Sequence, residues 1–96
     1  MNKAELIEQL AQKTGLQPRD ARTAVEALFD TDPGTGLIPE ELDRGGKVTI
    51  SGFGTFECRT RRARQGRNPR TGEAISIPAS KAPVFKAGKP FKDRIR

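Results

Sequence analysis

The sequence predicts an α+β fold in which a helical N-terminal half is followed by a strand-forming C-terminal half. Apolar residues recur at helical spacing over the first 29 positions, whereas from Lys47 onward the apolar period changes to two. The charge divides at the same place, because residues 1–46 hold five Lys/Arg and nine Asp/Glu while residues 47–96 hold thirteen and three. We therefore expect a near-neutral helical scaffold beside a strongly basic surface, within one small domain.

The chain is short for a self-sufficient core. A chain of 96 residues buries only roughly 60 to 65 % of its unfolded surface on folding. Hydrophobic residues make up 33 % of the sequence, yet five Phe and regularly spaced Leu, Ile and Val argue against disorder. These observations favour a folded chain that needs a partner subunit.

Two short amphipathic helices open the chain. Asn2 is a capping residue with Glu5 three positions later, and the first helix should end near Gly15. Pro18 suits the first turn of a second helix, where its missing N–H costs nothing. Both helices carry an apolar stripe that we expect to be core. The stripes consist of Leu6, Ile7, Leu10 and Ala11, and of Ala21, Ala24, Val25, Leu28 and Phe29.

A dense turn signal interrupts the second helix. The segment Asp30–Gly36 contains Pro33 followed by two glycines, which should break the helix. A short helical turn is expected to resume from Pro39 to Arg44, with Ile38 and Leu42 four residues apart on one face.

The C-terminal half predicts strands and a long hairpin. Val48 and Ile50 alternate with polar residues, so the first strand should have one buried face, and a glycine turn around Phe53 leads into the second strand. We expect a long hairpin over residues 57–77 with its turn at Gly66–Gly72. Pro78 and Pro83 should limit further sheet pairing, because proline cannot donate a hydrogen bond to a neighbouring strand. After them we expect a short strand at Val84–Phe85 and a last helix that begins at Pro90.

The hairpin is unusually basic. Between Arg59 and Arg70 the chain has six arginines and no acid, and Ala63 is the only apolar residue over residues 59–68. The like charges of this stretch repel one another, and phosphates would neutralise them, because the guanidinium group of arginine matches the geometry of phosphate oxygens. A two-stranded ribbon is also thin enough to follow a groove of DNA. The alternative is a solvated charged hairpin that protects a sheet edge, a task for which one or two charges suffice.

Pro69 lies at the tip of this hairpin. Its ring is apolar, its φ is fixed, and it has no backbone N–H to leave unpaired between stacked base pairs. It can therefore act as a wedge, although unstacking one step costs a few kcal/mol that phosphate contacts must offset. The alternative is an ordinary turn proline.

Several function classes are disfavoured by composition. The chain has no His, no Tyr and a single cysteine, Cys58, so we expect no catalytic residues, no metal site, no internal disulfide and no cofactor. The glycine-rich spots do not have the spacing of a phosphate-binding loop. No apolar run approaches the length of a membrane span and no signal-peptide pattern is present, so we expect a cytoplasmic protein without membrane contact.

Four motifs, taken in order, resemble the HU and integration host factor family of bacterial histone-like nucleoid proteins. They are Gly52-Phe53-Gly54-Thr55-Phe56, Gly66-Arg67-Asn68-Pro69-Arg70-Thr71-Gly72, Ile75-Ser76-Ile77-Pro78-Ala79 and Phe85-Lys86-Ala87-Gly88-Lys89, and the opening Met1–Ile7 is similar too. The resemblance implies an intertwined dimer with a helical dimerisation body, a three-stranded antiparallel sheet and β-ribbon arms. The implied parts are a body over 1–46, sheet over 47–58 and 74–86, a DNA-binding arm over 59–73 and a C-terminal helix over 87–96.

The resemblance also implies roles for individual residues. Phe53, Phe56 and Phe85 would meet in the dimer core, and Pro69 of each arm would intercalate in the minor groove. The DNA-binding residues would be Lys3, Arg59, Arg61, Arg62, Arg64, Arg67, Asn68, Pro69, Arg70, Thr71, Lys81, Lys86, Lys89 and Lys92. One departure is that Asp30–Arg44 is longer than its equivalent in typical family members and interrupts a helix that is usually continuous.

The function expected is that of a non-enzymatic architectural protein that bends, wraps or compacts double-stranded DNA with little sequence specificity. Its preferred partners would be bent, nicked or junction DNA, and it would act as a homodimer or as a heterodimer with a paralogue. One alternative is a sequence-preferring DNA-bending protein like integration host factor. Another is an RNA-binding protein, for which the lack of Trp and Tyr leaves few stacking platforms.

Overall fold

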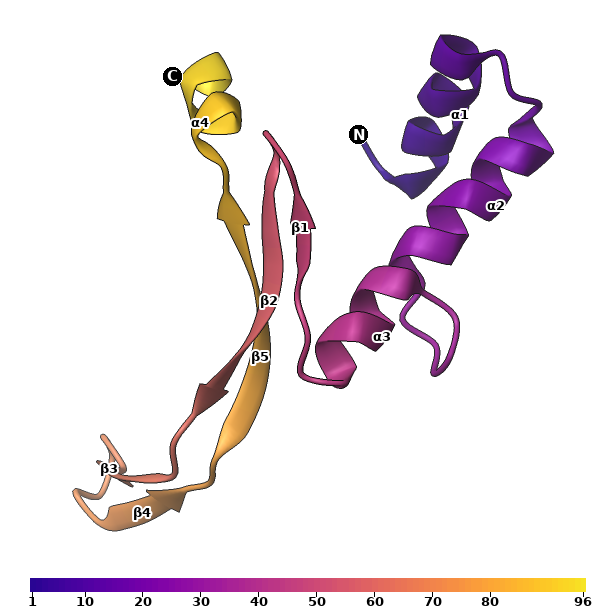
Figure 1. Cartoon of the computed structure of the whole chain (residues 1–96). Helices are drawn as coiled ribbons and strands as arrows, with labels where there is room; N and C mark the ends of the chain where they lie inside the picture. The colour runs from indigo at the N-terminus through magenta and orange to yellow at the C-terminus, as the bar shows by residue number, and fades with distance from the viewer. The chain divides into compact units, whose positions relative to one another are not determined.

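A computed structural model describes all residues, 1–96, as two compact units. The first unit is Met1–Arg44 and consists of helices, and the second is Gly45–Arg96 and carries all the strands (Figure 1). None of the helices is both long enough and apolar enough to cross a membrane.

The helical unit begins with the two helices that the sequence predicts. The Asn2 side chain caps the first helix by accepting a hydrogen bond of 2.9 Å from the Glu5 N–H, and Gly15 ends it in the left-handed conformation with φ of 78°. Pro18 occupies the first turn of the second helix, as expected. The helices of this unit are α1 (Lys3–Thr14), α2 (Pro18–Phe29) and α3 (Leu37–Asp43).

The core of the helical unit is smaller than the apolar stripes predicted. Ile7 and Ala11 of α1 pack on Ala21 and Val25 of α2, with Leu10 partly buried beside them. The expectation that every stripe residue is core was wrong for this single chain. α1 packs mainly on α2, and α2 packs on α1 and α3, which leaves the outer edges of both stripes uncovered. The exposed stripe residues are Leu6, Ala24, Leu28 and Phe29, the last two at 41% and 46% exposure.

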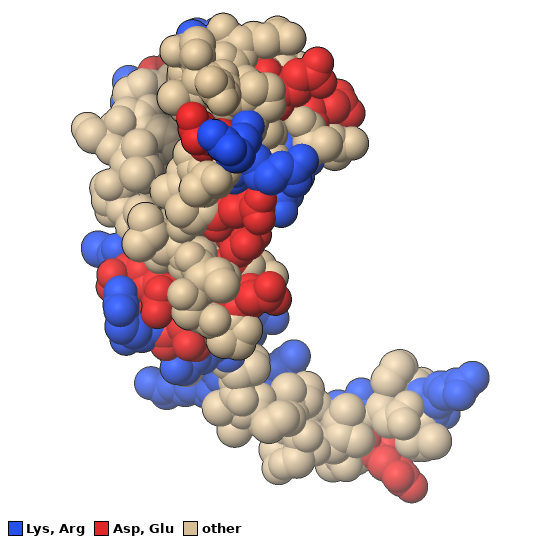
Figure 2. Space-filling model, turned by 90° about the vertical axis from the view of Figure 1, so that its right-hand side faces the viewer, with Lys and Arg blue, Asp and Glu red and all other residues tan.

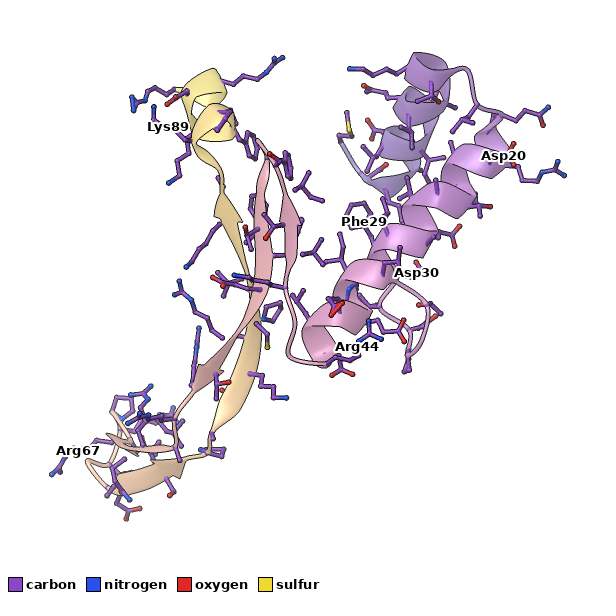
Figure 3. The ribbon with its side chains drawn as sticks, viewed as in Figure 1. Asp20, Phe29, Asp30, Arg44, Arg67 and Lys89 are labelled. Carbon is purple, nitrogen blue, oxygen red and sulfur yellow. The ribbon has the colours of Figure 1, made fainter.

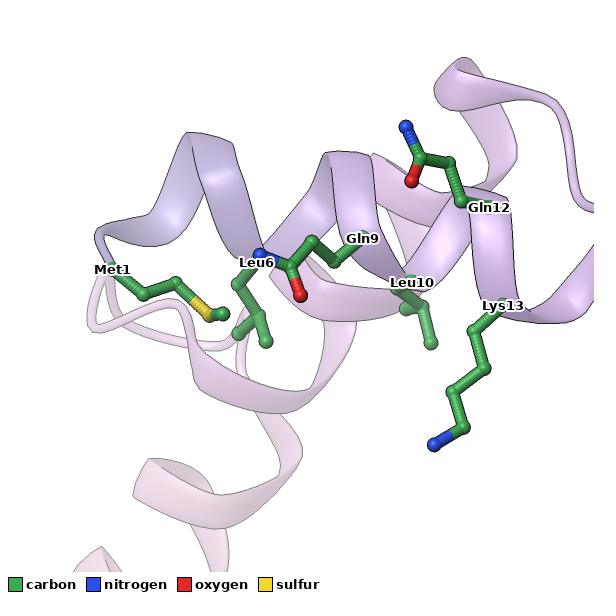
Figure 4. Close-up of a pocket in the computed structure, with 6 residues that line it drawn as sticks. All are labelled: Met1, Leu6, Gln9, Leu10, Gln12 and Lys13. Atoms are coloured by element: carbon green, nitrogen blue, oxygen red, sulfur yellow. The ribbon is translucent and has the colours of Figure 1, made fainter.

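One of these uncovered edges forms a shallow hollow along α1. Figure 4 shows the side chains of Met1, Leu6 and Leu10 on this side of the helix, with Gln9, Gln12 and Lys13 around them. The hollow is lined by apolar stems and three flexible polar side chains, and none of its lining residues is an acid or an aromatic group. It therefore lacks the convergent polar groups of a small-molecule site.

The interruption of the second helix is confirmed, and the chain loops out between α2 and α3 (Figure 1). The ends of this loop meet, because Gly36 is buried against the backbone of Asp30 so closely that a Cβ there would collide with the Asp30 carbonyl oxygen. α3 begins at Leu37 rather than at Pro39, which instead sits in the first turn, where a proline needs no intrahelical partner. Ile38 is half-buried and Leu42 is buried, as their spacing predicted.

The second unit contains two separate antiparallel sheets. Three strands form one sheet in the order β1-β2-β5, and two form a distal ribbon, β3-β4. The buried face expected for the first strand is only partly formed, because Val48 is half-buried and Ile50 is 47% exposed. The strands are β1 (Val48–Ile50), β2 (Gly54–Arg61), β3 (Arg64–Arg67), β4 (Ala74–Ile77) and β5 (Ser80–Ala87).

The prediction for Pro83 was wrong. β5 spans eight residues instead of two and pairs with β2 along its whole length, with Pro83 opposite Cys58. β5 lies at the edge of its sheet, so the nitrogen of Pro83 can face away from β2 without interrupting the ladder. Pro78, in contrast, lies outside any strand, as expected.

Four phenylalanines cluster at the end of the β1-β2-β5 sheet. Phe85 lies 5.4 Å from Phe53 and 4.8 Å from Phe56 between ring centroids. Phe91 of α4 (Lys89–Ile95) stacks on Phe53 at 4.7 Å with an interplanar angle of 12°. The last helix is thereby attached to the sheet through aromatic contacts, and it begins two residues later than the predicted range of 87–96.

Candidate nucleic-acid interface

The second unit extends into a two-part arm. β2 and β5 stay paired as far as Arg61 and Ser80, and the pairing then stops before it resumes in the distal ribbon at Arg64 and Ile77. The long hairpin expected over residues 57–77 is present, but its strand pairing is interrupted. The assignment of residues 74–77 to the main sheet was wrong, because Ala74–Ile77 pairs with β3 in the distal ribbon. Figure 1 shows that the arm bends where the pairing stops. The break has a local cause on one strand, because Pro78 lacks a ladder donor.

The tip of the arm is a closed five-residue turn over 68–72. The Gly72 N–H donates to the Asn68 carbonyl at 2.7 Å, and the Asn68 N–H donates to the Glu73 carbonyl at 2.9 Å. Gly72 adopts φ of 73°, in the left-handed region that glycine enters without strain. Pro69 is exposed at the start of this turn, beside the exposed Arg70.

Three side chains of the tip bond to the turn itself. The Arg67 Nη1 donates to the Gly72 carbonyl at 3.1 Å, and the Asn68 Oδ1 accepts from the Arg70 N–H at 2.8 Å. The Thr71 Oγ1 accepts from the Glu73 N–H at 3.3 Å. Sequence reasoning had assigned Arg67, Asn68 and Thr71 to DNA contacts alone, because the motif gives no sign of which side chains the turn uses.

The arm arginines lie in the open. All six are exposed, and none is paired with a carboxylate, although Arg44 and Arg96 elsewhere in the chain are. Figure 2 shows Lys and Arg side chains at the base and at the tip of the arm, and Figure 3 places Arg67 at its far end. The arm therefore presents uncompensated positive charge. The arginines concerned are Arg59, Arg61, Arg62, Arg64, Arg67 and Arg70.

Three of the five lysines predicted to contact DNA, unlike the arm arginines, are paired with a carboxylate. Lys3 lies 3.6 Å from Asp30, Lys86 lies 3.0 Å from Glu57, and Lys89 lies 3.5 Å from Asp93. The remaining two, Lys81 and Lys92, are exposed without an ion pair. Lys3 belongs to the helical unit and the other four to the second unit.

The Glu57–Lys86 pair also changes the acidity of Glu57. The hydrogen bond from Lys86 lowers the pKa of this carboxyl below its usual value, and the charges of Lys86, Arg59 and Lys47 add to the effect. Partial burial opposes the shift without overcoming it. Glu57 is therefore ionised near neutral pH and holds its lysine, a cross-strand arrangement that the sequence pattern did not reveal.

Sequence reasoning also left Phe91 out of the aromatic group. The signal was present, because Ala87, Phe91 and Ile95 are four residues apart, but the segment is short and strongly basic. No three His, Cys, Asp or Glu side chains gather where they could hold a metal ion. The charged side chains that lie together in the second unit are instead the arginines of the arm.

The sequence matches the model of a family described as bacterial DNA-binding protein over residues 1–96. The chain belongs to this family. Its relatives include the DNA-binding protein HU of Clostridium pasteurianum, 54% identical over 95 residues that cover 99% of this chain and 98% of that protein. The HU protein of Geobacillus stearothermophilus is 52% identical and is covered completely, as is this chain. The family resemblance noted in the sequence is thereby confirmed.

Solved HU structures share the fold. A cocrystal structure of Anabaena HU with DNA matches with a TM-score of 0.82 and 42% identity, covering 99% of this chain and 97% of that one. HU from Thermotoga maritima matches over the full length of both chains with a TM-score of 0.65 and 30% identity. These likenesses confirm the predicted fold class, in which helices join an antiparallel sheet that extends into an arm.

Proposed function

We propose that this HU-family chain is a non-enzymatic architectural protein that binds the minor groove of double-stranded DNA and bends it with little sequence specificity. The observation that carries the proposal is the arm, where six exposed arginines have no carboxylate partner and flank an exposed proline at the tip. A polyanion is the ligand that neutralises such a surface, and backbone phosphates supply it without base readout.

Pro69 would intercalate and the arginines would track the groove. Unstacking one base step costs a few kcal/mol, and bending a site of 20 to 30 base pairs costs about 1 to 6 kcal/mol by elastic estimates. Phosphate contacts along the arm and at the body offset this cost. The residues proposed to contact DNA are Lys3, Arg59, Arg61, Arg62, Arg64, Arg67, Asn68, Pro69, Arg70, Thr71, Lys81, Lys86, Lys89 and Lys92.

The active species would be a homodimer whose two arms grip one duplex. In the single chain eleven large hydrophobic side chains are exposed, among them Phe29 of the helical unit at 46% and Phe53 of the second unit at 43%. A second copy would cover such surface, with Phe53, Phe56 and Phe85 in the shared core. The two units of each chain would then act as one HU-type domain, working in the cytoplasm at the nucleoid.

The experiment that tests this function is a titration of the protein onto intact, nicked and cruciform DNA and onto duplex RNA of equal length, at several salt concentrations. Preference for distorted DNA with a steep salt dependence is expected. Equal or tighter binding to RNA would refute the proposal. A strong preference for one selected duplex over random ones would instead indicate a site-specific protein of the integration host factor type.

Replacement of Pro69 by Ala tests the wedge separately. Pro69→Ala should reduce the bend of an intact duplex, followed by fluorescence energy transfer between its ends, more than it reduces affinity for DNA that is already nicked. Equal losses on intact and nicked DNA would count against insertion, because the cost of unstacking is already met in nicked DNA.

A further inference from the structure

The turn that carries Pro69 is formed in the chain alone, without a nucleic acid. Two backbone hydrogen bonds close it, from Gly72 to Asn68 at 2.7 Å and from Asn68 to Glu73 at 2.9 Å. The Asn68 Oδ1 adds a third by accepting from the Arg70 N–H, and the Asn68 side chain is half-buried although it lies at the end of an exposed arm. The conformation around Pro69 is thus determined by contacts within the turn.

Arg67 is the arginine that reaches across this turn. Its Nη1 donates to the carbonyl of Gly72, five residues later, at 3.1 Å, so the side chain spans the base of the turn. Arg64 and Arg70, the arginines on either side of it in sequence, make no side-chain hydrogen bond within the chain. Three side chains of equal charge therefore occupy two different structural states at the same end of the arm.

We propose that Arg67 is a positioning residue for Pro69, which it serves by clamping the turn before DNA is bound. The proposal rests on the proposed role of Pro69 as a wedge. A tip that is ordered in advance loses less conformational entropy when it inserts between base pairs, and a mobile tip would lose part of the binding free energy in becoming ordered. Arg67 acts on the DNA step through Pro69, in addition to contributing charge.

The chemistry of the guanidinium suits both tasks. It carries five N–H donors in a rigid planar fork, and the bond to Gly72 uses one of them. The remaining donors and the full positive charge stay available to a phosphate. A lysine at the same position would keep the charge but not the planar fork, so Arg67→Lys separates charge from clamping.

The matched control is the same substitution at Arg70. Arg67→Lys and Arg70→Lys both keep the net charge of the arm and lie three residues apart. We expect Arg67→Lys to lower the bend of a saturated intact duplex and to weaken affinity for it about threefold to tenfold, the range expected for losing one ordinary hydrogen bond. The salt dependence should be unchanged, and Arg70→Lys should lower the bend and the affinity less than Arg67→Lys does, because it breaks no side-chain hydrogen bond within the turn. Equal effects of the two substitutions would overturn the proposal.

A measurement without DNA separates the clamp from the wedge. Backbone amide exchange and 15N relaxation of Arg70, Thr71 and Gly72 in the free protein should show a rigid turn that becomes mobile in Arg67→Met and stays rigid in Arg70→Met. Unchanged turn amides in Arg67→Met would overturn the proposal whatever happens on DNA. If the Pro69→Ala protein bends DNA normally, the proposed role of Pro69 as a wedge is refuted. That outcome can be told apart from a failure of the Arg67 proposal, because the amide measurement reports on the turn alone.

Discussion

The Lys86 Nζ and the Glu57 Oε1 lie 3.0 Å apart on neighbouring strands, so a lysine proposed to contact phosphate is already held by a carboxylate. Glu57 is on β2 and Lys86 on β5, where Lys86 pairs in register with Thr55 and lies diagonally across from Glu57. DNA must compete with this carboxylate for Lys86, whereas no such competition exists at the arm arginines. The protein therefore presents two kinds of cation to a ligand.

Glu57→Gln should raise affinity for an intact duplex about two- to fourfold, because the loss of this exposed ion pair releases Lys86 to bind phosphate. Affinity is measured by fluorescence anisotropy at low salt. Glu73→Gln is the matched control, since it removes one negative charge from the arm without releasing a lysine from an ion pair. An equal gain in both variants would show that net charge alone is responsible.

The same pair makes stability depend on pH. The pKa of Glu57 is lowered in the folded chain, chiefly by the hydrogen bond from Lys86, so its stabilising contribution is present above the unfolded pKa. That contribution is lost as pH falls through the lower, folded pKa. Urea unfolding from about pH 6 to about pH 3 should show the wild type losing its advantage over Glu57→Gln toward acid. A difference that stays constant with pH would contradict the assignment.

Local signals predicted the helix ends well. Asn2, Gly15 and Pro18 each act through the few residues beside them, by capping, by a left-handed φ and by a missing donor in the first turn. The same is true of the turn signal between Asp30 and Gly36. Features that depend on nearest neighbours in sequence could therefore be located before the structure was known.

Features that depend on strand pairing could not. Pro83 reads as a strand breaker, and only the position of β5 at the sheet edge makes it harmless. Periodicity identified the apolar face of α2 but not what covers it, so Leu28 and Phe29 were expected in the core. At the tip, the arginine pattern indicated a polyanion-binding arm, yet the bond from Arg67 to Gly72 depends on side-chain direction, which sequence spacing does not contain.

Phe91 should contribute to the stability of the second unit. Its ring stacks on Phe53 at 4.7 Å and is half-buried, so Phe91→Ala should lower the free energy of unfolding by about 1–2 kcal/mol, less than the cost for a fully buried ring. Ile95→Ala, in the same helix and 71% exposed, is the control and should have little effect. Urea unfolding at fixed protein concentration measures both, and equal stabilities for wild type and Phe91→Ala would show that α4 is not held by this stack.

Gly36 should tolerate no side chain, for a reason unrelated to its φ of −90°. A Cβ at this position would meet the carbonyl oxygen of Asp30, a backbone atom that cannot move aside as a flexible side chain would. Gly36→Ala should therefore destabilise the helical unit by about 1–3 kcal/mol, the usual cost of overpacking. Thr31→Ala in the same loop removes an exposed side chain with no hydrogen bond and should change stability by less than about 0.5 kcal/mol.

Thermal unfolding followed by circular dichroism at 222 nm reports on both loop variants through the helices. A Gly36→Ala protein as stable as Thr31→Ala would mean that the loop ends separate at little cost. The contact between Asp30 and Gly36 would then not be what lets α3 follow α2 so closely across the loop. A loss confined to Gly36→Ala would show that the loop between α2 and α3 is accommodated by closing its ends tightly, which leaves the helices on either side to pack as one unit.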